Sequence, residues 1–328
     1  MFRCLERIVE LTTEKLTRND GEEIVKEYSK VEQVPPAPGD SWAQHDTMIS
    51  KKLCKKACKF KKKNRYSNLF PFDKSIVNFD SKDHYINASW MKLLPWLPNQ
   101  NFIATMGPMH PSSYGSALKT DFDENVPENT CPDFWRMVWE KNVKVIVMLC
   151  QIQDGFTGCS RYFPEKSKSM IHDEFTVKSL TGDQINDSTI ERVFEVTKNG
   201  HSESKKVHHY QFLAWPNYGV PGSTGPIGNF LKLVHKKAHD IDAKDPEFVV
   251  HCSGGIGRSG TFLTAYGAYS HYLNCLKSDK LDVEPVDITE TVIELRKQRH
   301  PWMVEGERQY KMCYAIIIDL LKELYQKD

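Results

Sequence analysis

Two residues in the C-terminal third of the chain, Cys252 and Arg258, have types and spacing that suit phosphate chemistry. They lie in the stretch EFVVHCSGGIGRSGTF (247–262), separated by five residues of which three are glycine. A cysteine thiolate is a strong nucleophile, and an arginine guanidinium binds two phosphate oxygens at once. The pair therefore predicts attack by sulfur on a phosphate ester that the arginine holds in place.

The residues between this pair are predicted to form a phosphate-binding loop. They follow an apolar strand and precede a helical pattern, so their backbone N–H groups converge on a tetrahedral anion where the helix dipole favours negative charge. Glycine permits the backbone conformations that such a loop demands. The same N–H groups favour the thiolate, and Ser259 is placed to donate a hydrogen bond to the sulfur and make it a better leaving group. The predicted loop consists of Ser253, Gly254, Gly255, Ile256 and Gly257.

Two other interpretations of this segment agree less well with its residues. Cysteine is often buried in a protein core without a chemical role, but here a strand, a glycine-rich turn, a correctly spaced arginine and a helix coincide. A nucleotide-binding P-loop is excluded, because the Gly-Lys-Ser/Thr ending that it requires is absent. The sequence therefore favours a nucleophilic role for Cys252.

The elements that must position this loop follow from the hydrophobic pattern on either side of it. From residue 66 to about 215, β-branched and aromatic runs such as 144–149 and 191–197 alternate with turn clusters, which indicates a sheet. The run FVV (248–250) is apolar throughout, as is typical of a buried central strand. We expect an α/β (α+β) fold in which helices pack on a mixed β-sheet. Helical patterns follow at 261–273, 288–299 and 307–325.

The chain divides into a short N-terminal extension and one large domain. Residues 1–31 have helical periodicity, and VPPAPGD (34–40) interrupts it. We therefore predict a helical extension with its linker at 1–40 and a domain at 41–328. The segment 109–130 is polar, lacks periodicity and is long for a loop inside a domain, so we expect a surface insertion, with the docking of a partner as the alternative.

The composition of the whole chain limits the classes of function. Its 328 residues, 40% of them hydrophobic, are enough to bury a substantial core. Lys plus Arg number 44 against 43 Asp plus Glu, so no overall charge attracts nucleic acid or a membrane. No apolar run reaches the roughly 18 to 20 residues that span a bilayer, and no signal peptide is evident. Nine cysteines, an odd number, favour reduced thiols. We expect a cytoplasmic protein without stable membrane insertion.

A lysine-dense stretch, KKLCKKACKFKKKNR (51–65), precedes the predicted sheet. Its simplest interpretation is a solvated face that leads into the domain. A nuclear-import signal within 51–63, or a patch that binds an anionic surface, is the alternative. The stretch contains Cys54 and Cys58, but no second pair of Cys or His residues at ligand spacing completes a metal site, so we predict no bound metal.

Seven further segments resemble, in the same order along the chain, those of the cysteine-dependent protein-tyrosine phosphatase family in its phosphotyrosine-specific catalytic domain. The resemblance extends from about residue 60 to the end of the chain. It implies the protein-tyrosine-phosphatase fold, a highly twisted mixed β-sheet flanked by helices. The matching segments are KNRYSNLFPFD (63–73), DHYINAS (83–89), FIATMGP (102–108), DFWRMVW (133–139), CSRYFP (159–164), AWPNYGVP (214–221) and MVEGERQY (303–310).

The resemblance assigns roles to individual residues. It implies that Cys252 forms a phosphocysteine and that Arg258 clamps the phosphate within the loop 253–257. It also implies that Tyr66 stacks on the substrate ring and makes the pocket deep enough for phosphotyrosine; the alternative is an ordinary half-buried strand tyrosine. The implied partner is a phosphotyrosine-containing protein. No metal or organic cofactor is implied, because thiolate, arginine and water carry the reaction, and no pattern indicates an oligomeric state.

One departure from the family pattern concerns proton transfer. In the family, the loop that matches AWPNYGVP carries an aspartate after Trp-Pro, and this residue protonates the leaving phenolate; here the position is Asn217. An amide has no proton to transfer at neutral pH, and a tyrosine phenol with a pKa of about 10 leaves poorly without one. Loss of a general acid typically lowers a rate by about 10²- to 10⁴-fold. The alternative is that Asn217 only stabilises the turn and another group supplies the proton.

Three other positions depart from the family. The family uses two glutamines to position the water that hydrolyses the phosphocysteine, and this chain has Glu305 and Gln309. A carboxylate at position 305 would repel a phosphate dianion, serve as a substitute acid or base, or simply lie at the surface. Asn68 stands where the family usually has an aspartate that pairs with the substrate backbone, and Met106 replaces a glutamine before Gly-Pro.

Two functions from different classes are consistent with these residues. The first is a phosphotyrosine phosphatase slowed by Asn217. The second is a catalytically inactive pseudophosphatase that binds phosphotyrosine, because capture needs the loop, Arg258 and Tyr66 but no general acid. A scaffold that acts through 109–130 or the lysine-dense stretch would not depend on Arg258. We prefer the phosphatase, because Cys252 and Arg258 are kept together with a complete glycine-rich loop.

Overall fold

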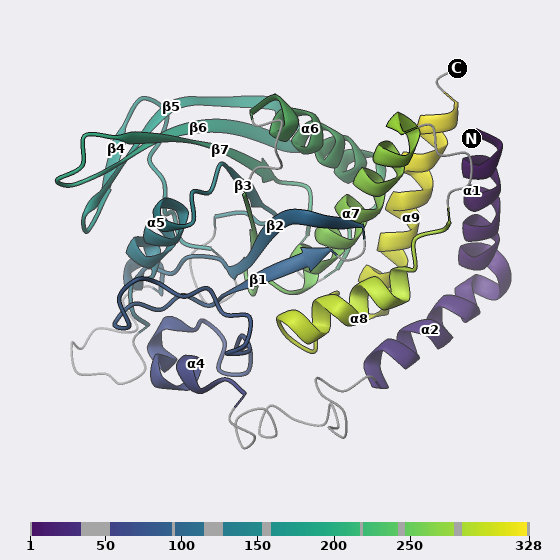
Figure 1. Cartoon of the computed structure of the whole chain (residues 1–328), viewed down its shortest axis with the longest axis horizontal. Helices are drawn as coiled ribbons and strands as arrows, with labels where there is room; N and C mark the ends of the chain where they lie inside the picture. The colour runs from purple at the N-terminus through teal and green to yellow at the C-terminus, as the bar shows by residue number, and fades with distance from the viewer. Residues whose placement is uncertain are drawn as a thin grey trace.

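The fold is organised around one twisted, mixed β-sheet (Figure 1). The computed structural model describes residues 2–33, 53–93, 96–114, 127–152, 159–216, 219–241, 247–278 and 284–326. Within these residues the sheet has eight strands in the spatial order β1-β2-β8-β3-β7-β6-β5-β4. The strands are β1 (Ala88–Leu93), β2 (Leu97–Met106), β3 (Val145–Met148), β4 (Ser169–His172), β5 (Phe175–Asn186), β6 (Thr189–Lys198), β7 (Ser204–Phe212) and β8 (Phe248–Cys252).

Strand β8, which ends at Cys252, occupies an interior position in the sheet. It pairs in parallel with β2 and β3, and β3 pairs in parallel with β7. The other neighbouring strands are antiparallel. Every residue of β8 is buried, as expected of an apolar run with a strand on either side. The predicted mixed sheet and its buried central strand are confirmed.

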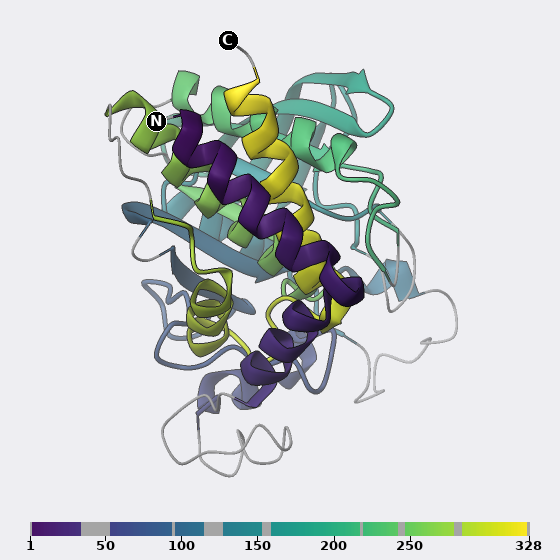
Figure 2. The same cartoon turned by 90° about the vertical axis from the view of Figure 1, so that its right-hand side faces the viewer.

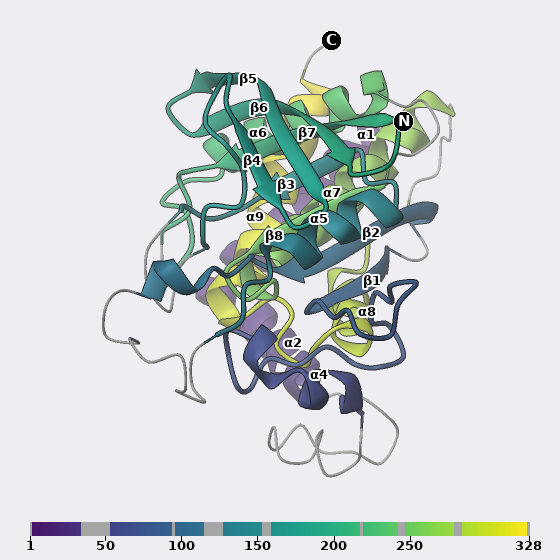
Figure 3. The ribbon, with the colours of Figure 1, turned by 90° about the vertical axis from the view of Figure 1, so that its left-hand side faces the viewer.

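Helices cover both faces of the sheet (Figures 1 and 3). The three C-terminal helical patterns form α7, α8 and α9, as predicted. Helix α5 was not predicted, although Asp133, Arg136 and Glu140 are spaced three and four residues apart and share one face of the helix; its aromatic residues were included in the region interpreted as a sheet. The α-helices are α1 (Phe2–Thr17), α2 (Glu22–Gln33), α4 (Lys55–Lys59), α5 (Cys131–Glu140), α6 (Gly225–Ile241), α7 (Gly257–Lys277), α8 (Ile288–Gln298) and α9 (Gly306–Tyr325). Short 3-10 helices lie at Arg18–Gly21, Lys61–Lys63 and Pro111–Tyr114.

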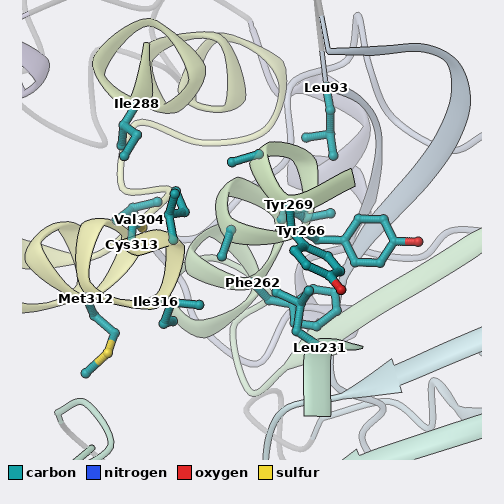
Figure 4. Close-up of a cluster of buried hydrophobic side chains, with 14 of the residues drawn as sticks. Leu93, Leu231, Phe262, Tyr266, Tyr269, Ile288, Val304, Met312, Cys313 and Ile316 are labelled. Carbon is teal, nitrogen blue, oxygen red and sulfur yellow. The ribbon is translucent and has the colours of Figure 1, made fainter. Parts of the chain in front are cut away.

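Alternate residues of the central strands divide the hydrophobic core between the two faces. Val147 and Val250 join the cluster that contains side chains of α6, α7 and α9. Ile146 and Val249 join the opposite cluster, which contains α5. Figure 4 shows part of the first cluster, where side chains of α7 and α9 meet. This packing fixes β8 and α7, and therefore the loop between them, with respect to the rest of the domain.

The N-terminal helices α1 and α2 lie against α9 and α8 (Figure 2). Their apolar residues, including Leu5, Ile8, Ile24 and Val31, are buried in the same cluster as α7 and α9. The predicted extension is therefore helical and shares the core of the domain. Its boundary at residue 40 lies outside the described residues and stays a prediction. Across the described ranges, we find no helix that has both the length and the apolar character needed to cross a membrane.

The ends of the predicted insertion 109–130 are part of the folded domain. Met109 and Thr130 are buried, and their backbones and the Thr130 hydroxyl form two hydrogen bonds of 2.8 and 2.9 Å. These ends therefore do not belong to a surface loop, and the centre of the segment, 115–126, lies outside the described residues. In the lysine-dense stretch, Lys63 forms a half-buried ion pair of 2.7 Å with Asp133 of α5.

Candidate active site

The loop between β8 and α7 wraps around the sulfur of Cys252. This side chain is only 3% exposed, and its Sγ accepts a hydrogen bond of 3.2 Å from the Gly255 N–H. Helix α7 begins at Gly257, directly after the loop. The sulfur thus lies beside backbone donors at a helix N-terminus, an arrangement that stabilises negative charge. The sequence predicted that these groups lie together, and in the structure they do.

Gly255 is required for the backbone path of this loop. Its φ is +69°, in the left-handed region that residues with a side chain rarely adopt. A Cβ at this position would overlap the carbonyl of Thr105 in β2 and lie 2.8 Å from Nη2 of Arg299. The loop can therefore pass so close to β2 only because residue 255 has no side chain.

We expect Gly255→Ala to lower the free energy of unfolding by on the order of 2 to 4 kcal/mol, because left-handed strain and overpacking act together. Urea denaturation would measure the change. Gly222→Ala is the matched control, since no atom lies within 4 Å of its Cβ position. Equal stability of the two variants would show that the loop relaxes without strain.

Arg299 is a buried cation beneath the loop that the sequence did not reveal. Its guanidinium donates to the carbonyls of Gly255 at 2.6 Å and Gly254 at 3.3 Å, and to Oδ1 of Asn87 at 3.0 Å. Burial lowers the pKa of Arg299 to about 10, while the nearby Cys252 favours its charged form. Arg299 thus ties the end of α8 to the phosphate loop. Nothing in the spacing of LRKQR (295–299) distinguishes it from the basic residues beside it.

Arg258 lies in the first turn of α7, and one of its Nη atoms donates to the backbone carbonyl of Leu149, just after β3, at 3.1 Å. This bond fixes one side of the guanidinium plane. Arg258 and Cys252 both line a cavity of about 620 Å³. The expected pairing of sulfur and guanidinium in one site is therefore present in the structure.

Tyr66 also lines this cavity, beside the phosphate loop, and lies in a bend rather than in a strand. Its hydroxyl and Oγ of Ser253 are 2.8 Å apart and hydrogen-bonded. Tyr66 is half-buried, as in the alternative interpretation, but it does not lie in a strand; its stacking on a substrate ring stays a prediction. Asn68, two residues later, also lines the cavity, and its backbone carbonyl is 3.2 Å from Nε2 of His300. Trp302 adds a second aromatic side chain to the lining, 46% exposed, that the sequence did not indicate.

Glu305 and Gln309 lie next to the first residue of α7. A Cβ at Gly257 would be 2.7 Å from Oε1 of Gln309 and 3.0 Å from Oε2 of Glu305. Gln309 is buried and its Oε1 accepts the Glu305 N–H at 3.0 Å, whereas the Glu305 side chain is exposed. A carboxylate directly before α9 and an amide in its first turns thus face the phosphate loop, and both line the cavity.

The structure also places three further residues that the sequence singled out: Ser259, Ile256 and Met106. Ser259 is fully buried, and its hydroxyl has no hydrogen-bond partner within the described part of the chain, so the expected bond to the sulfur is not formed here. Ile256 is buried in the core cluster beside α7 and lines the cavity with its neighbours. Met106, in register with Cys252, accepts the backbone N–H of Arg65 on its Sδ at 3.1 Å. That bond fixes the backbone beside Tyr66.

Asn217 lies outside the described residues. On either side of it, Pro216 and Gly219 line the cavity. Trp215 is buried, and its indole N–H donates to the carbonyl of Gly219 at 3.0 Å. The described ends of the segment that matches the general-acid loop are therefore held at the cavity.

One group of potential metal ligands lies behind the loop in the described part of the chain. Cys150, Cys159 and His251 are buried, and their ligand atoms lie within 4.8 Å of one another. Sequence spacing could not indicate this group, because only the fold brings the three residues together. The nitrogen Nε2 of His251 is 2.7 Å from the Tyr162 hydroxyl, and hydrogen bonding to Cys159 together with burial raises the pKa of Cys150 well above its usual value. Both ring nitrogens of His251 lie within hydrogen-bond distance of protein oxygens, Nε2 of the Tyr162 hydroxyl and Nδ1 of the Cys252 carbonyl at 3.2 Å, so we interpret the group as a buried polar network.

Comparisons with known proteins agree with this geometry. The family model described as "Protein-tyrosine phosphatase" matches residues 60–319. The chain is 35% identical over 271 residues to receptor-type tyrosine-protein phosphatase eta from Mus musculus, covering 81% of this chain and 19% of that protein. It is 31% identical over 245 residues to tyrosine-protein phosphatase 2 from Dictyostelium discoideum, covering 74% of this chain and 56% of that protein. It is 27% identical over 310 residues to tyrosine-protein phosphatase non-receptor type 20 from Rattus norvegicus, covering 94% of this chain and 63% of that protein. The chain therefore spans less than two thirds of the length of each of these relatives.

Proposed function

Since this chain belongs to the protein-tyrosine phosphatase family, we propose that it binds phosphotyrosine-containing proteins and hydrolyses the phosphate ester through a phosphocysteine at Cys252. One observation carries the proposal: the Cys252 sulfur, the N–H donors of the loop, Arg258 and Tyr66 all border the same cavity. Such a site combines a nucleophile, an anion-binding loop and an aromatic wall. These are the groups that capture and attack of a phosphotyrosine require.

In the first step, Cys252 Sγ attacks phosphorus. The S–P bond forms as the bond between phosphorus and the tyrosine oxygen breaks, and the electron pair of that bond leaves with the phenolate. The loop N–H groups and Arg258 bind the phosphate oxygens, on which charge builds up. The leaving phenolate needs a proton, and Asn217 cannot donate one at neutral pH. We therefore propose that this step is slow for tyrosine esters.

In the second step, water attacks the phosphocysteine, the S–P bond breaks, and inorganic phosphate and the thiolate are released. Glu305 and Gln309 face Gly257 from α9, where they can orient this water, and the Glu305 carboxylate can accept its proton. Asn68, at the rim of the cavity, is proposed to contact the substrate backbone, although an amide holds a peptide N–H less strongly than a carboxylate. We also propose that the catalytic domain extends over 41–328, preceded by the extension 1–40.

A single-turnover assay on the wild-type chain tests this function. A phosphotyrosine peptide and the same peptide with phosphoserine would each be mixed with excess protein, following released phosphate and trapped phosphoenzyme. We expect slow phosphate release and a phosphoenzyme with phosphotyrosine alone. Binding of the phosphotyrosine peptide without phosphoenzyme or phosphate would overturn the enzyme proposal and leave a phosphotyrosine-binding module.

Arg258→Ala separates both of these functions from a scaffold that acts elsewhere on the surface. The change removes a guanidinium that would donate two charge-assisted hydrogen bonds to phosphate, so we expect peptide affinity to fall by about 10²-fold or more. Fluorescence polarisation with a labelled phosphotyrosine peptide would measure this. Arg18→Ala, an exposed arginine at the end of α1, is the control and should bind as the wild type does. Unchanged binding by Arg258→Ala would contradict a phosphate-directed function.

A further inference from the structure

The turn that precedes α9 has a strained backbone. Val304 has a φ of +58° and Gly306 a φ of +79°. A positive φ is a genuine outlier for a β-branched residue, and it persists only where the surroundings hold the backbone in place. Val304 is fully buried. The residue between them is Glu305, so this strained turn carries a residue of the candidate active site.

Arg296 of α8 holds the first half of the turn. Its Nε donates to the Met303 carbonyl at 3.0 Å, and one Nη donates to the Val304 carbonyl at 3.4 Å. The other Nη donates to the carbonyl of Val31 at the end of α2, at 3.2 Å. The same guanidinium therefore connects the turn to the N-terminal helices.

Tyr28 of α2 holds the second half of the turn. Its hydroxyl accepts the Gly306 N–H at 2.9 Å and is 3.4 Å from an Nη of Arg296. Its ring is 8% exposed and packs 5.4 Å from the ring of Tyr310 in α9, between ring centroids. Burial raises the pKa of Tyr28, so the hydroxyl stays neutral. The N-terminal extension thus contacts the backbone directly after Glu305.

This turn also determines the positions of two side chains at the phosphate loop. The Glu305 N–H donates to Oε1 of Gln309, and both side chains lie against Gly257. A change in φ at residues 304 to 306 would therefore move the Glu305 carboxylate and release the Gln309 amide. Neither effect would move Cys252 or Arg258, which belong to β8 and α7.

We propose that Tyr28 is a positioning residue for the second step of the reaction: through its hydrogen bond to Gly306, the N-terminal helix α2 keeps Glu305 and Gln309 in place to orient the water that attacks the phosphocysteine. This inference rests on the proposed function. It gives the extension a kinetic role, because phosphate capture and attack by sulfur use groups that Tyr28 does not contact.

The test compares Tyr28→Phe with the wild type, using Tyr314→Phe as the matched control. Tyr314 lies in the same interface between helices, but its hydroxyl donates to Glu27 of α2 at 2.6 Å instead of contacting the turn. The substrate is dinitrophenyl phosphate, whose acidic phenol leaves without a proton donor. The first step is then fast despite Asn217, and hydrolysis of the phosphocysteine limits turnover.

For Tyr28→Phe we expect kcat to fall about three- to tenfold, as for the loss of one buried hydrogen bond. KM should fall by the same factor, so that kcat/KM is unchanged, because kcat/KM reports only steps up to phosphocysteine formation. Rapid quenching should trap more phosphoenzyme. A fall of kcat/KM with constant KM, or equal behaviour of Tyr28→Phe and Tyr314→Phe, would overturn the proposal.

Amide hydrogen exchange of the full chain provides a measurement that does not need turnover. We expect Tyr28→Phe to lose protection at residues 304 to 309 and to keep it in β8, and Tyr314→Phe to keep it in both. Unchanged protection at 304 to 309 in Tyr28→Phe would also overturn the proposal. Failure of the proposed function has a different signature, since the wild type itself would then form no phosphoenzyme from dinitrophenyl phosphate.

Discussion

Cys252→Ser is expected to abolish phosphate release while phosphotyrosine binding persists. A serine hydroxyl stays protonated in the place of a thiolate, so no phosphoenzyme should form and turnover should fall by on the order of 10⁵-fold or more. The loop N–H groups, Arg258 and Tyr66 are unchanged by the substitution, so the affinity for a phosphotyrosine peptide should be preserved. Single-turnover phosphate release and fluorescence polarisation measure the two quantities separately.

The control for this prediction is Cys58→Ser. Cys58 is one of nine free cysteines and lies half-buried in α4, away from the cavity. We expect this variant to retain wild-type turnover. If Cys252→Ser still released phosphate at the wild-type rate, the hydrolysis would come from another group or from a contaminating enzyme, and the phosphocysteine route would be wrong.

Asn217→Asp is expected to raise the single-turnover rate with phosphotyrosine peptide by about 10²- to 10⁴-fold, the usual contribution of a general acid. The carboxyl group can protonate the leaving phenolate, which the amide cannot do. The described residues Pro216 and Gly219, before and after this position, line the cavity. The gain should vanish with dinitrophenyl phosphate, because its leaving group needs no proton.

Asn199→Asp provides the control for the added negative charge. Asn199 is exposed in the turn between β6 and β7, and the change should leave the rate with phosphotyrosine peptide unaltered. If Asn217→Asp gave no increase while the wild type formed phosphoenzyme slowly, proton transfer would not be the slow step. An equal increase with both substrates would indicate that position 217 acts on the phosphate or on the loop, and not on the leaving group.

The composition of the active-site loop could be predicted because its parts are contiguous in sequence. The strand β8, the loop and α7 follow one another, and an apolar run, closely spaced glycines and a helical pattern each constrain the backbone locally. Gly255 is an example. Its φ of +69° and its close approach to strand β2 both require a residue without a side chain. Tyr66 and Gln309 could be placed at the site only through the family resemblance.

Helix α5 shows how a helical signal can be overlooked. Asp133, Arg136 and Glu140 are spaced three and four residues apart, as on one face of a helix, but the aromatic residues between them are also typical of a buried strand. The packing of α5 between the sheet and the 53–93 region removes water from both of its sides. This environment, in which the buried Asp133 pairs with Lys63, is a property of the assembled domain.

The phosphate loop, the mixed sheet and the three C-terminal helices could be derived from the sequence, because short-range spacing controls the geometry within one segment of the chain. Three contacts are evident only in the folded domain: Arg299 lies beneath the loop, Met106 supports the backbone at Tyr66, and Tyr28 contacts Gly306. These contacts join residues up to 278 positions apart. Such contacts form only when particular faces of the sheet and the helices pack against one another. Which faces do so depends on the packing of the whole domain.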